Sequence, residues 1–269
     1  MATTWLRVRQ RKRKEQASWL ASPPAPLPRN APRKGRFAVL TPVLNENELE
    51  ALRGLDTCTV SNTIETFHLR LRNTGFADSS VRCMFEDFPP LVGYAATARL
   101  RTEEAPVDSS RFHDRSDWWR SILDVPPPRI VVLEDMDKPP GRGAFVGDVH
   151  AAILRALGCV GFVTDGAVRE LPGVRQLELQ LFAGNVAVSH CYAHIFHFGA
   201  VVNIGGLEVR PGDLLHGDRH GLLSIPPQIA AQVAPAANKL RQKERELIAL
   251  LRAEKMSVDR LREITRSSE

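Results

Sequence analysis

The segment from Gly147 to Glu170, GDVHAAILRALGCVGFVTDGAVRE, constrains the fold of this chain most strongly. Val149 to Leu157 has the apolar spacing of a short helix, and Gly158 is a typical C-terminal stop signal. The apolar run Cys159 to Thr164 predicts a buried strand, because an Asp-Gly turn signal follows it. With an upstream strand at Arg129 to Leu133, the pattern predicts a strand–helix–strand unit of an α/β fold.

Polar groups stand at both ends of this helix–strand segment. Asp148 begins it and the pair Arg169-Glu170 ends it, with 20 residues between Asp148 and Arg169. Backbone N–H groups at a helix start bind carboxylates, and a guanidinium matches a carboxylate with two hydrogen bonds. Asp148 and Glu170 supply oxygen ligands that Mg²⁺ accepts, directly or through water. The pattern therefore indicates binding of a small oxo-acid on a divalent metal.

The same residues have a structural alternative that needs no ligand. Asp148 would then be a helix N-cap, and Arg169 with Glu170 would be a solvated charge pair after a turn. Spacing alone leaves both interpretations open.

Three segments carry a resemblance to a known family. These are the segment from Gly147, the segment GGLEVRPGDLLHGDRHGLLSIP from Gly205, and LDTCTVSNTIETF near the start. They resemble the family of 4-hydroxy-4-methyl-2-oxoglutarate (HMG/CHA) aldolases and RraA-like proteins, which is also named for a regulator of ribonuclease E activity. The resemblance covers about Asn45 to Pro227. It implies an α/β fold, a β/β/α layered domain of the swivelling-domain type, with helical N- and C-terminal extensions.

The resemblance also implies roles for individual residues. The aldolase branch is marked by Asp, twenty residues and then Arg-Asp, and these positions hold Asp148, Arg169 and Glu170 here. By resemblance, Arg169 binds the oxo-acid carboxylate, Glu170 ligates Mg²⁺ or Mn²⁺, and Asp148 reaches the metal through water. Arg169 and Asp148 are thus the expected catalytic residues. The substrate-binding turn corresponds to Gly147, Asp148, Val149 and His150. Glu170 replaces the usual Asp, and Asn62 stands where family members often have Asp.

The function that the resemblance implies is a class II, metal-dependent carbon–carbon lyase. Such an aldolase or decarboxylase would cleave a small 4-hydroxy-2-oxo acid or oxaloacetate and release pyruvate, with the metal polarising the ketone. The family also implies a homotrimer or a hexamer. The alternative is a non-catalytic RraA-like regulator that binds a protein partner such as a ribonuclease. That branch lacks the acidic residue that this chain has in Glu170.

Composition predicts a soluble, cytoplasmic enzyme of 269 residues. No run of about 18 apolar residues is present, which argues against a membrane partner. The four cysteines have no CxxC spacing, so we expect reduced thiols.

Positive charge is concentrated at the start of the chain. Residues 1–36 contain ten Lys or Arg and one acid, a charge of +9, and subtracting this from the total of +5 leaves about −4 for residues 37–269. We therefore expect no nucleic-acid partner for the folded part. We predict a disordered basic, Pro-rich tail over 1–36, a catalytic domain over 37–227 and a charged amphipathic helix over 228–269. Organelle targeting by the tail is an alternative, because transit peptides are Arg-rich.

Two further patterns have competing interpretations. One pattern is formed by His190, His194 and His197, which with Cys191 suit a zinc-type site, although on one strand His190 and His194 would share a face while His197 points the other way. The alternative is that these histidines line the active site without binding zinc. The run HGDRHG from His216 resembles a ligand cluster, but its residues are also those of tight turns in which Asp213 and Asp218 bond to backbone. For this run we favour the turns.

Elsewhere the sequence predicts conventional elements. Glu46 to Leu69 predicts one or two helices, and Leu91 to Arg101 predicts a strand. Val186 to Ile204 predicts one or two strands, and Leu207 to Pro226 predicts turn-rich β structure.

Overall fold

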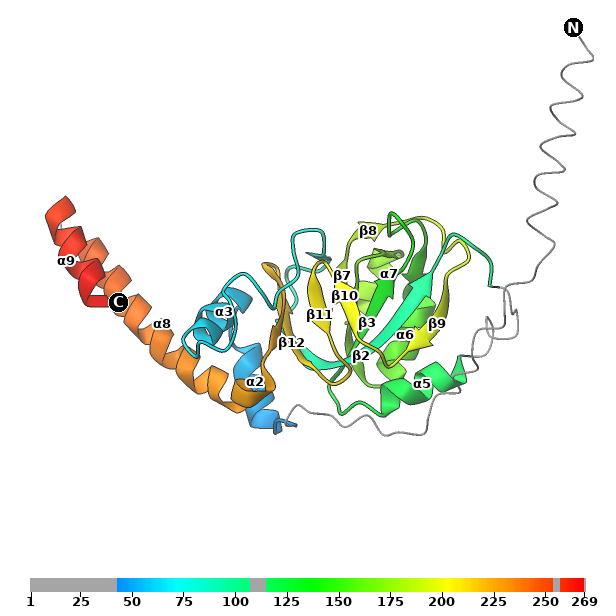
Figure 1. The fold of residues 1–269 in the computed structure, drawn as a ribbon, viewed down its shortest axis with the longest axis horizontal. Helices are drawn as coiled ribbons and strands as arrows, with labels where there is room; N and C mark the ends of the chain where they lie inside the picture. Colours follow the sequence, from blue (N-terminus) through cyan, green and yellow to red (C-terminus); the bar gives the residue numbers. More distant parts are fainter. Residues whose placement is uncertain (1–42, 107–114, 254–256, 269) are drawn as a thin grey trace, which may run out of the picture. The chain divides into compact units, whose positions relative to one another are not determined.

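The fold is a mixed α/β domain built on one eight-stranded sheet (Figure 1), seen in a computed structural model that describes residues 43–106, 115–253 and 257–268. Four central strands run parallel, and antiparallel strands flank them. In spatial order the strands are β1 (Arg82–Cys83), β7 (Gln180–Ala183), β5 (Cys159–Thr164), β3 (Arg129–Asp135), β2 (Leu91–Arg101), β12 (Leu214–Asp218) and β13 (Gly221–Ile225). The eighth strand, β9 (His194–Phe198), pairs with the second half of β2.

The two faces of the sheet are covered by different layers, and β2 contacts both. Val92, Tyr94 and Ala96 belong to a core cluster shared with the helices. Leu91 and Ala95 belong to a second cluster, shared with a short ribbon. The ribbon strands are β10 (Val202–Ile204) and β11 (Leu207–Val209). The alternation follows from the strand geometry, which points successive side chains to opposite faces. The domain thus has the β/β/α layers that the resemblance implied.

The helices begin at local signals in the sequence. Asn45 and Glu48 form a reciprocal capping box at the start of α2, and Asp56 caps α3. The helices are α2 (Glu46–Arg53), α3 (Thr57–Glu65), α5 (Ser116–Leu123), α6 (Asp148–Ala156), α7 (Leu171–Gln176), the 3₁₀ turn η1 (Pro227–Ile229), α8 (Ala230–Ala253) and α9 (Val258–Ser268). The helix α8 packs against α2 and α3 through its first turns, where Val233 and Ala237 are buried. The described helices include none that is long and apolar enough to cross a membrane.

A small parallel sheet places the sequence motif. Its strands, in order, are β4 (Ala144–Val146), β6 (Ala167–Val168) and β8 (Asn185–Val186). Gly147 follows β4, and Arg169 follows β6, so both segments leave neighbouring parallel strands at the same end. The N–H of Arg169 donates to the carbonyl of Val146 at 2.9 Å, which holds the two exits together.

Most of the predicted elements are confirmed. The unit β3–α6–β5 is the predicted strand–helix–strand unit, and Gly158 follows α6 with a φ of +75°. The helical region after Glu46 contains two helices, and β2 spans the predicted residues. Asp213 and Asp218 accept backbone N–H groups in turns, as predicted. The tail predicted over 1–36 lies outside the described residues.

Two predictions about the later strands are wrong. The range Val186 to Ile204 contains parts of three short strands rather than one or two. His190 and His194 do not share a strand, because β9 begins at His194 and His190 lies in the loop before it. The reason is a left-handed residue, Cys191 at a φ of 46°, which interrupts extended backbone between them.

Candidate active site

The segments that follow β4 and β6 meet in a pocket of about 370 Å³. A pocket of this size is within the usual range for small-molecule sites. The pocket brings together all six residues that the sequence predicted for the site: Gly147, Asp148, Val149, His150, Arg169 and Glu170. Two further residues with functional side chains also line it, Arg115 and His190.

Glu170 links the two segments at the pocket. Its Oε1 accepts a hydrogen bond from Nη2 of Arg169 at 2.7 Å, and its Oε2 accepts the backbone N–H of Asp148 at 3.1 Å. The N–H of Asp148, and next the guanidinium of Arg169, lower the pKa of Glu170, so its carboxylate is ionised at neutral pH. The backbone of Glu170 is left-handed, with a φ of 55° and a ψ of 39°. This conformation is uncommon for a residue other than glycine and concentrates at functional sites.

Gly147 is required by the position of the Glu170 carboxylate. A Cβ atom at residue 147 would lie 2.1 Å from Oε2 of Glu170, far inside contact distance. A second close approach occurs at Gly173 of α7, where a Cβ atom would lie 3.0 Å from the Cβ of Asp148. The two glycines therefore allow the start of α6 to pack directly against Glu170 and α7.

The N–H groups at the start of α6 already bind carboxylates of this chain. The N–H of Asp148 donates to Glu170, and the N–H of Val149 donates to Oδ1 of Asp148 at 2.6 Å. A helix N-terminus favours negative charge, which explains why both acids lie there. A substrate carboxylate bound at this turn would replace these contacts.

His150 lies beside a guanidinium and an aromatic ring. Its Nε2 is in contact with Nη1 of Arg115, and its ring centroid is 4.9 Å from that of Phe145. A guanidinium only donates hydrogen bonds, so Nε2 accepts and the proton of the neutral ring is on Nδ1. Burial, and next the charge of Arg115, lower the pKa of His150 to about 4. The imidazole is therefore neutral at pH 7.

Arg115 was not predicted from the sequence. It directly precedes α5, in the Pro-rich connection between β2 and β3, and no motif surrounds it. Its contact with His150 spans 35 positions of the chain, so only the tertiary structure brings it to the pocket.

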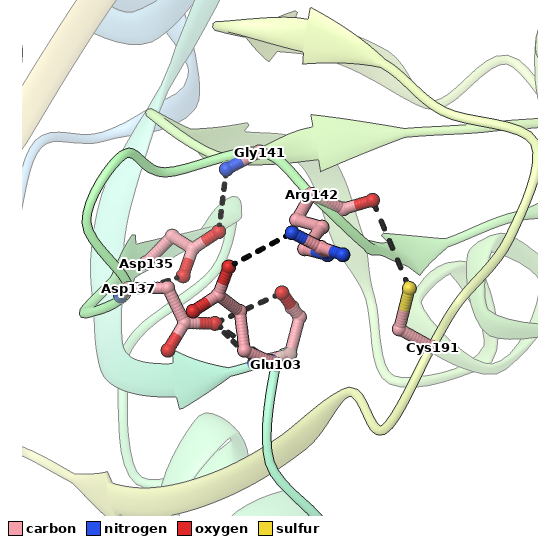
Figure 2. Close-up of polar contacts among 7 residues, drawn as sticks. Glu103, Asp135, Asp137, Gly141, Arg142 and Cys191 are labelled. Carbon is pink, nitrogen blue, oxygen red and sulfur yellow. Dashed lines mark hydrogen bonds and ion pairs between the residues drawn. The ribbon is translucent and has the colours of Figure 1, made fainter. Parts of the chain in front are cut away.

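His190 reaches the pocket from a loop that is tied to the connection between β3 and β4. Figure 2 shows this tie, in which Sγ of Cys191 donates to the carbonyl of Arg142 at 3.8 Å. The connection is itself held to the end of β3, where Asp135 accepts the N–H of Gly141 at 2.8 Å. Nδ1 of His190 contacts the carbonyl of Cys191 at 2.8 Å. Because a carbonyl only accepts, Nδ1 carries the proton, and Nε2 keeps a lone pair.

The oxygen donors of the pocket suit a hard divalent cation. Mg²⁺ in proteins binds one or two carboxylates and keeps several waters, and the pocket offers the carboxylates of Asp148 and Glu170. Within the described ranges, no group of three or more His, Cys, Asp or Glu side chains is arranged around a metal position. The zinc-type arrangement of His190, Cys191 and His194 is therefore not assembled in this part of the chain, where Nδ1 of His194 instead contacts the carbonyl of Tyr192 at 2.8 Å.

Comparison with known families identifies the fold and places the pocket within it. The RraA-like family model, described as Aldolase/RraA, matches residues 57–223, which is more than half of the chain and includes every pocket residue named above. The chain belongs to the RraA-like family. Members of this family include both aldolases and RraA proteins. Membership confirms the resemblance seen in the sequence.

Individual relatives are distant. A protein of Halalkalibacterium halodurans with the provisional name 4-hydroxy-4-methyl-2-oxoglutarate aldolase is 28% identical over 121 residues. That match covers 45% of this chain and only 57% of the relative.

The similarity to solved structures extends over more of the chain. An uncharacterized protein from Pseudomonas syringae pv. tomato has a TM-score of 0.65 at 22% identity, and the match covers 84% of this chain and 96% of that one. Streptomyces coelicolor RraAS2, described as an unusual member of the RNase ES inhibitor RraA protein family, has a TM-score of 0.62 at 19% identity. The match covers 78% of this chain and 100% of RraAS2. At these identities the likeness shows the fold.

Proposed function

We propose that this protein is a divalent-metal-dependent carbon–carbon lyase that cleaves a small 4-hydroxy-2-oxo acid, or decarboxylates oxaloacetate, and releases pyruvate. The observation that carries the proposal is the contact of Glu170 with both Arg169 and the first N–H of α6 in one pocket. In this arrangement a guanidinium, a helix N-terminus and two acidic side chains line one pocket, which supports the binding of one small oxo-acid beside a metal ion. The family and the provisional name of one relative are consistent with this chemistry.

The first role of the chain is to bind and orient the oxo-acid. Arg169 offers two parallel N–H donors to the carboxylate, and its side chain is only 30% exposed, so few rotamers are open to it. The N–H groups at the start of α6 supply further donors on the same side of the pocket. Glu170 would hold Mg²⁺ or Mn²⁺, with Asp148 acting through water. When bound, the ion supplies a Lewis acid that polarises the ketone.

The second role is proton transfer, for which the two pocket histidines differ. Nε2 of His150 accepts from Arg115, whereas Nε2 of His190 has no bonding partner among the described residues. We assign His190 as the base that takes the proton of the substrate 4-hydroxyl. The C3–C4 bond then breaks, the 4-carbon becomes a carbonyl, and the electron pair goes to the enolate of pyruvate. Protonation of that enolate at C3 completes the reaction.

A direct assay of turnover tests the proposal. Metal-free protein is incubated with a panel of 4-hydroxy-2-oxo acids and with oxaloacetate, and pyruvate is measured with EDTA, Mg²⁺, Mn²⁺ or Zn²⁺, after subtraction of the rate with free metal. We expect activity with Mg²⁺ or Mn²⁺ and none in EDTA, because carboxylates and water are hard ligands. Full activity in EDTA contradicts the mechanism. If Zn²⁺ alone restores activity, the metal ligands are histidines rather than the two carboxylates.

Matched variants separate the site from the rest of the surface. Glu170→Gln removes one ligand charge and should weaken metal affinity by about 10- to 100-fold. Glu103→Gln is the control, because Glu103 forms an exposed ion pair with Arg142 at 3.5 Å outside the pocket. Wild-type protein that turns over no member of the panel favours the alternative, a non-catalytic regulator that binds a protein partner.

A further inference from the structure

The pocket contains a second guanidinium, whose role the proposed reaction does not yet explain. Arg115 lines the same pocket as Arg169 but comes from the start of α5 rather than from the motif. Its Cζ lies 5.0 Å from the ring centroid of Phe145, and its Nη1 contacts His150. Phe145 is itself fixed by an edge-on contact with Trp118 at 5.6 Å. Among the described residues, the side chains that hold this guanidinium in place are therefore rings and not acids.

The two arginines differ in their charge partners. Arg169 forms an ion pair with Glu170 at 2.7 Å, whereas Arg115 forms no ion pair with any described residue. Burial lowers the pKa of Arg115, but an arginine remains charged in proteins. A partly buried cation without a counter-ion is costly unless a ligand supplies one. Its neighbour His150 cannot supply that charge, because an imidazole side chain carries no negative charge.

The balance of charge in the pocket sets the charge of the ligand. With one divalent cation bound, the charge of that cation balances Asp148 and Glu170, so the pocket residues named here keep a net charge of +2 from Arg115 and Arg169. A monocarboxylate compensates one of them, and a dicarboxylate compensates both. Because Arg115 has no acid partner among the described residues, this excess positive charge favours a ligand with a second carboxylate.

We propose that Arg115 binds a second carboxylate of the ligand, distal to the one bound by Arg169, and so selects diacids over monoacids. The proposal rests on the proposed function for the identity of the first contact. Arg115 is a specificity-determining residue in this scheme, and it takes no part in breaking the bond. Phe145 and His150 position its donors, since five N–H groups leave several free toward the pocket after the contact with Nε2.

Binding of two unreactive hydroxy acids tests the proposal. Malate and lactate are both 2-hydroxy acids, and malate carries a second carboxylate that lactate lacks. Their affinities are measured by titration calorimetry at constant ionic strength, with and without Mg²⁺, for wild type, Arg115→Gln, Arg115→Lys and Arg120→Gln. Arg120 is the matched control, because it lies on the same helix, pairs with Asp117 and is 72% exposed.

We expect wild type to bind malate more tightly than lactate. Arg115→Gln should lose about tenfold or more in malate affinity and little in lactate affinity, because a charge-assisted contact is lost. Arg115→Lys keeps the charge without the planar fork, so it should lose less, and it replaces the Gln variant if that one does not fold. Arg120→Gln should bind both acids like wild type.

Three results would overturn the role of Arg115: wild type that does not prefer malate, an unchanged malate affinity in the variants, or an equal loss for both acids. The last result would mean that Arg115 only supports the packing of Phe145 and His150. Pyruvate release is measured on the same samples. Absent turnover with an intact malate preference defeats the proposed reaction alone, and intact turnover without that preference defeats only the role of Arg115.

Discussion

Two clusters in this chain use histidine and aspartate in opposite ways. The His216 cluster, formed by Thr57, His216 and Asp218, lies between α3 and β12. Nδ1 of His216 accepts from the Thr57 hydroxyl at 3.0 Å, and Nε2 donates to the carbonyl of Leu52 at 3.1 Å. The carboxylate of Asp218 accepts the N–H of Thr57 at 2.9 Å. His216 is fully buried, and both of its ring nitrogens have partners from the chain itself.

The pocket also contains histidine and aspartate, but not all of its charged side chains have partners within the described part of the chain. Glu170 is exposed and left-handed, and Arg115 forms no ion pair in the described part of the chain. The motif-like run HGDRHG thus belongs to a structural cluster, while an arginine outside any motif belongs to the pocket. The His216 cluster and the pocket differ in whether the polar side chains find hydrogen-bond or ion-pair partners within the chain. Residue type alone does not predict this difference.

The largest expected effect is a loss of activity from a substitution in the pocket. Arg169→Lys keeps the charge but loses the two-pronged contact with a carboxylate, so kcat/KM should fall by about 100-fold. Thermal stability should stay near that of wild type, because the side chain lies at the surface of the pocket. Arg120→Lys is the control. Wild-type kinetics in Arg169→Lys would contradict the proposed role of Arg169 in binding the substrate carboxylate.

The next effect is on stability and belongs to the His216 cluster. His216→Ala removes the hydrogen bonds of the ring to the Leu52 carbonyl and the Thr57 hydroxyl and leaves a buried cavity, so it should lower the free energy of unfolding by about 2–4 kcal/mol. His220→Ala, at a side chain that is 49% exposed, should cost far less. Denaturant titration measures both. The refolded His216 variant should keep its turnover per folded molecule, and a selective loss of activity would place this cluster in the mechanism.

Gly147→Ala should have a smaller effect, confined to the pocket. The added methyl group displaces the Glu170 carboxylate, so kcat/KM and metal affinity should each fall by about tenfold. Gly54→Ala is the matched control, because its Cβ would meet nothing closer than 3.5 Å. Equal activity in both variants would mean that the contact between Glu170 and α6 is dispensable.

The pH dependence of stability involves both regions. Burial lowers the pKa of His216, and burial with Arg115 lowers that of His150 to about 4. Below the unfolded pKa of about 6.5, the unfolded chain binds protons that the folded chain does not. Stability is therefore complete above this pH and declines below it, by up to about 1.4 kcal/mol per pH unit for each group. His216→Gln should reduce the slope of stability against pH between pH 6.5 and 5. Identical slopes in wild type and His216→Gln would contradict the assignment.

The smallest expected effect is that of removing the basic start of the chain. Residues 1–36 carry a charge of +9 and lie outside the family match. We expect deletion of Met1 to Lys34 to leave the oligomer and turnover unchanged, as measured by sedimentation and by pyruvate release. If the truncated protein dissociates or loses activity, the deleted residues are needed for assembly or turnover.

The sequence predicts those parts whose signals are local. The strand β2, the helix α6 and the stop at Gly158 follow from short-range patterns of apolar residues and glycine. The sheet β4–β6–β8 does not, because strands of two or three residues are too short for a pattern. Arg115 could not be found either, since its partners His150 and Phe145 are distant in the chain. The family resemblance, rather than spacing, is what favoured the motif as a site.

The close contact between Gly147 and Glu170 means that the effect of a substitution at residue 147 depends on which residue occupies position 170. A methyl group at residue 147 collides with Oε2 of Glu170 only because the glutamate side chain is long enough to reach it. Glu170→Asp shortens that side chain by one methylene and draws the oxygen back. Gly147→Ala should therefore be less harmful beside aspartate than beside glutamate, because the tight contact that remains is the one with Cγ of Arg169 at 3.3 Å. If residue 170 is shortened first, the later change at residue 147 costs less activity. If residue 147 changes first, the single variant loses more activity.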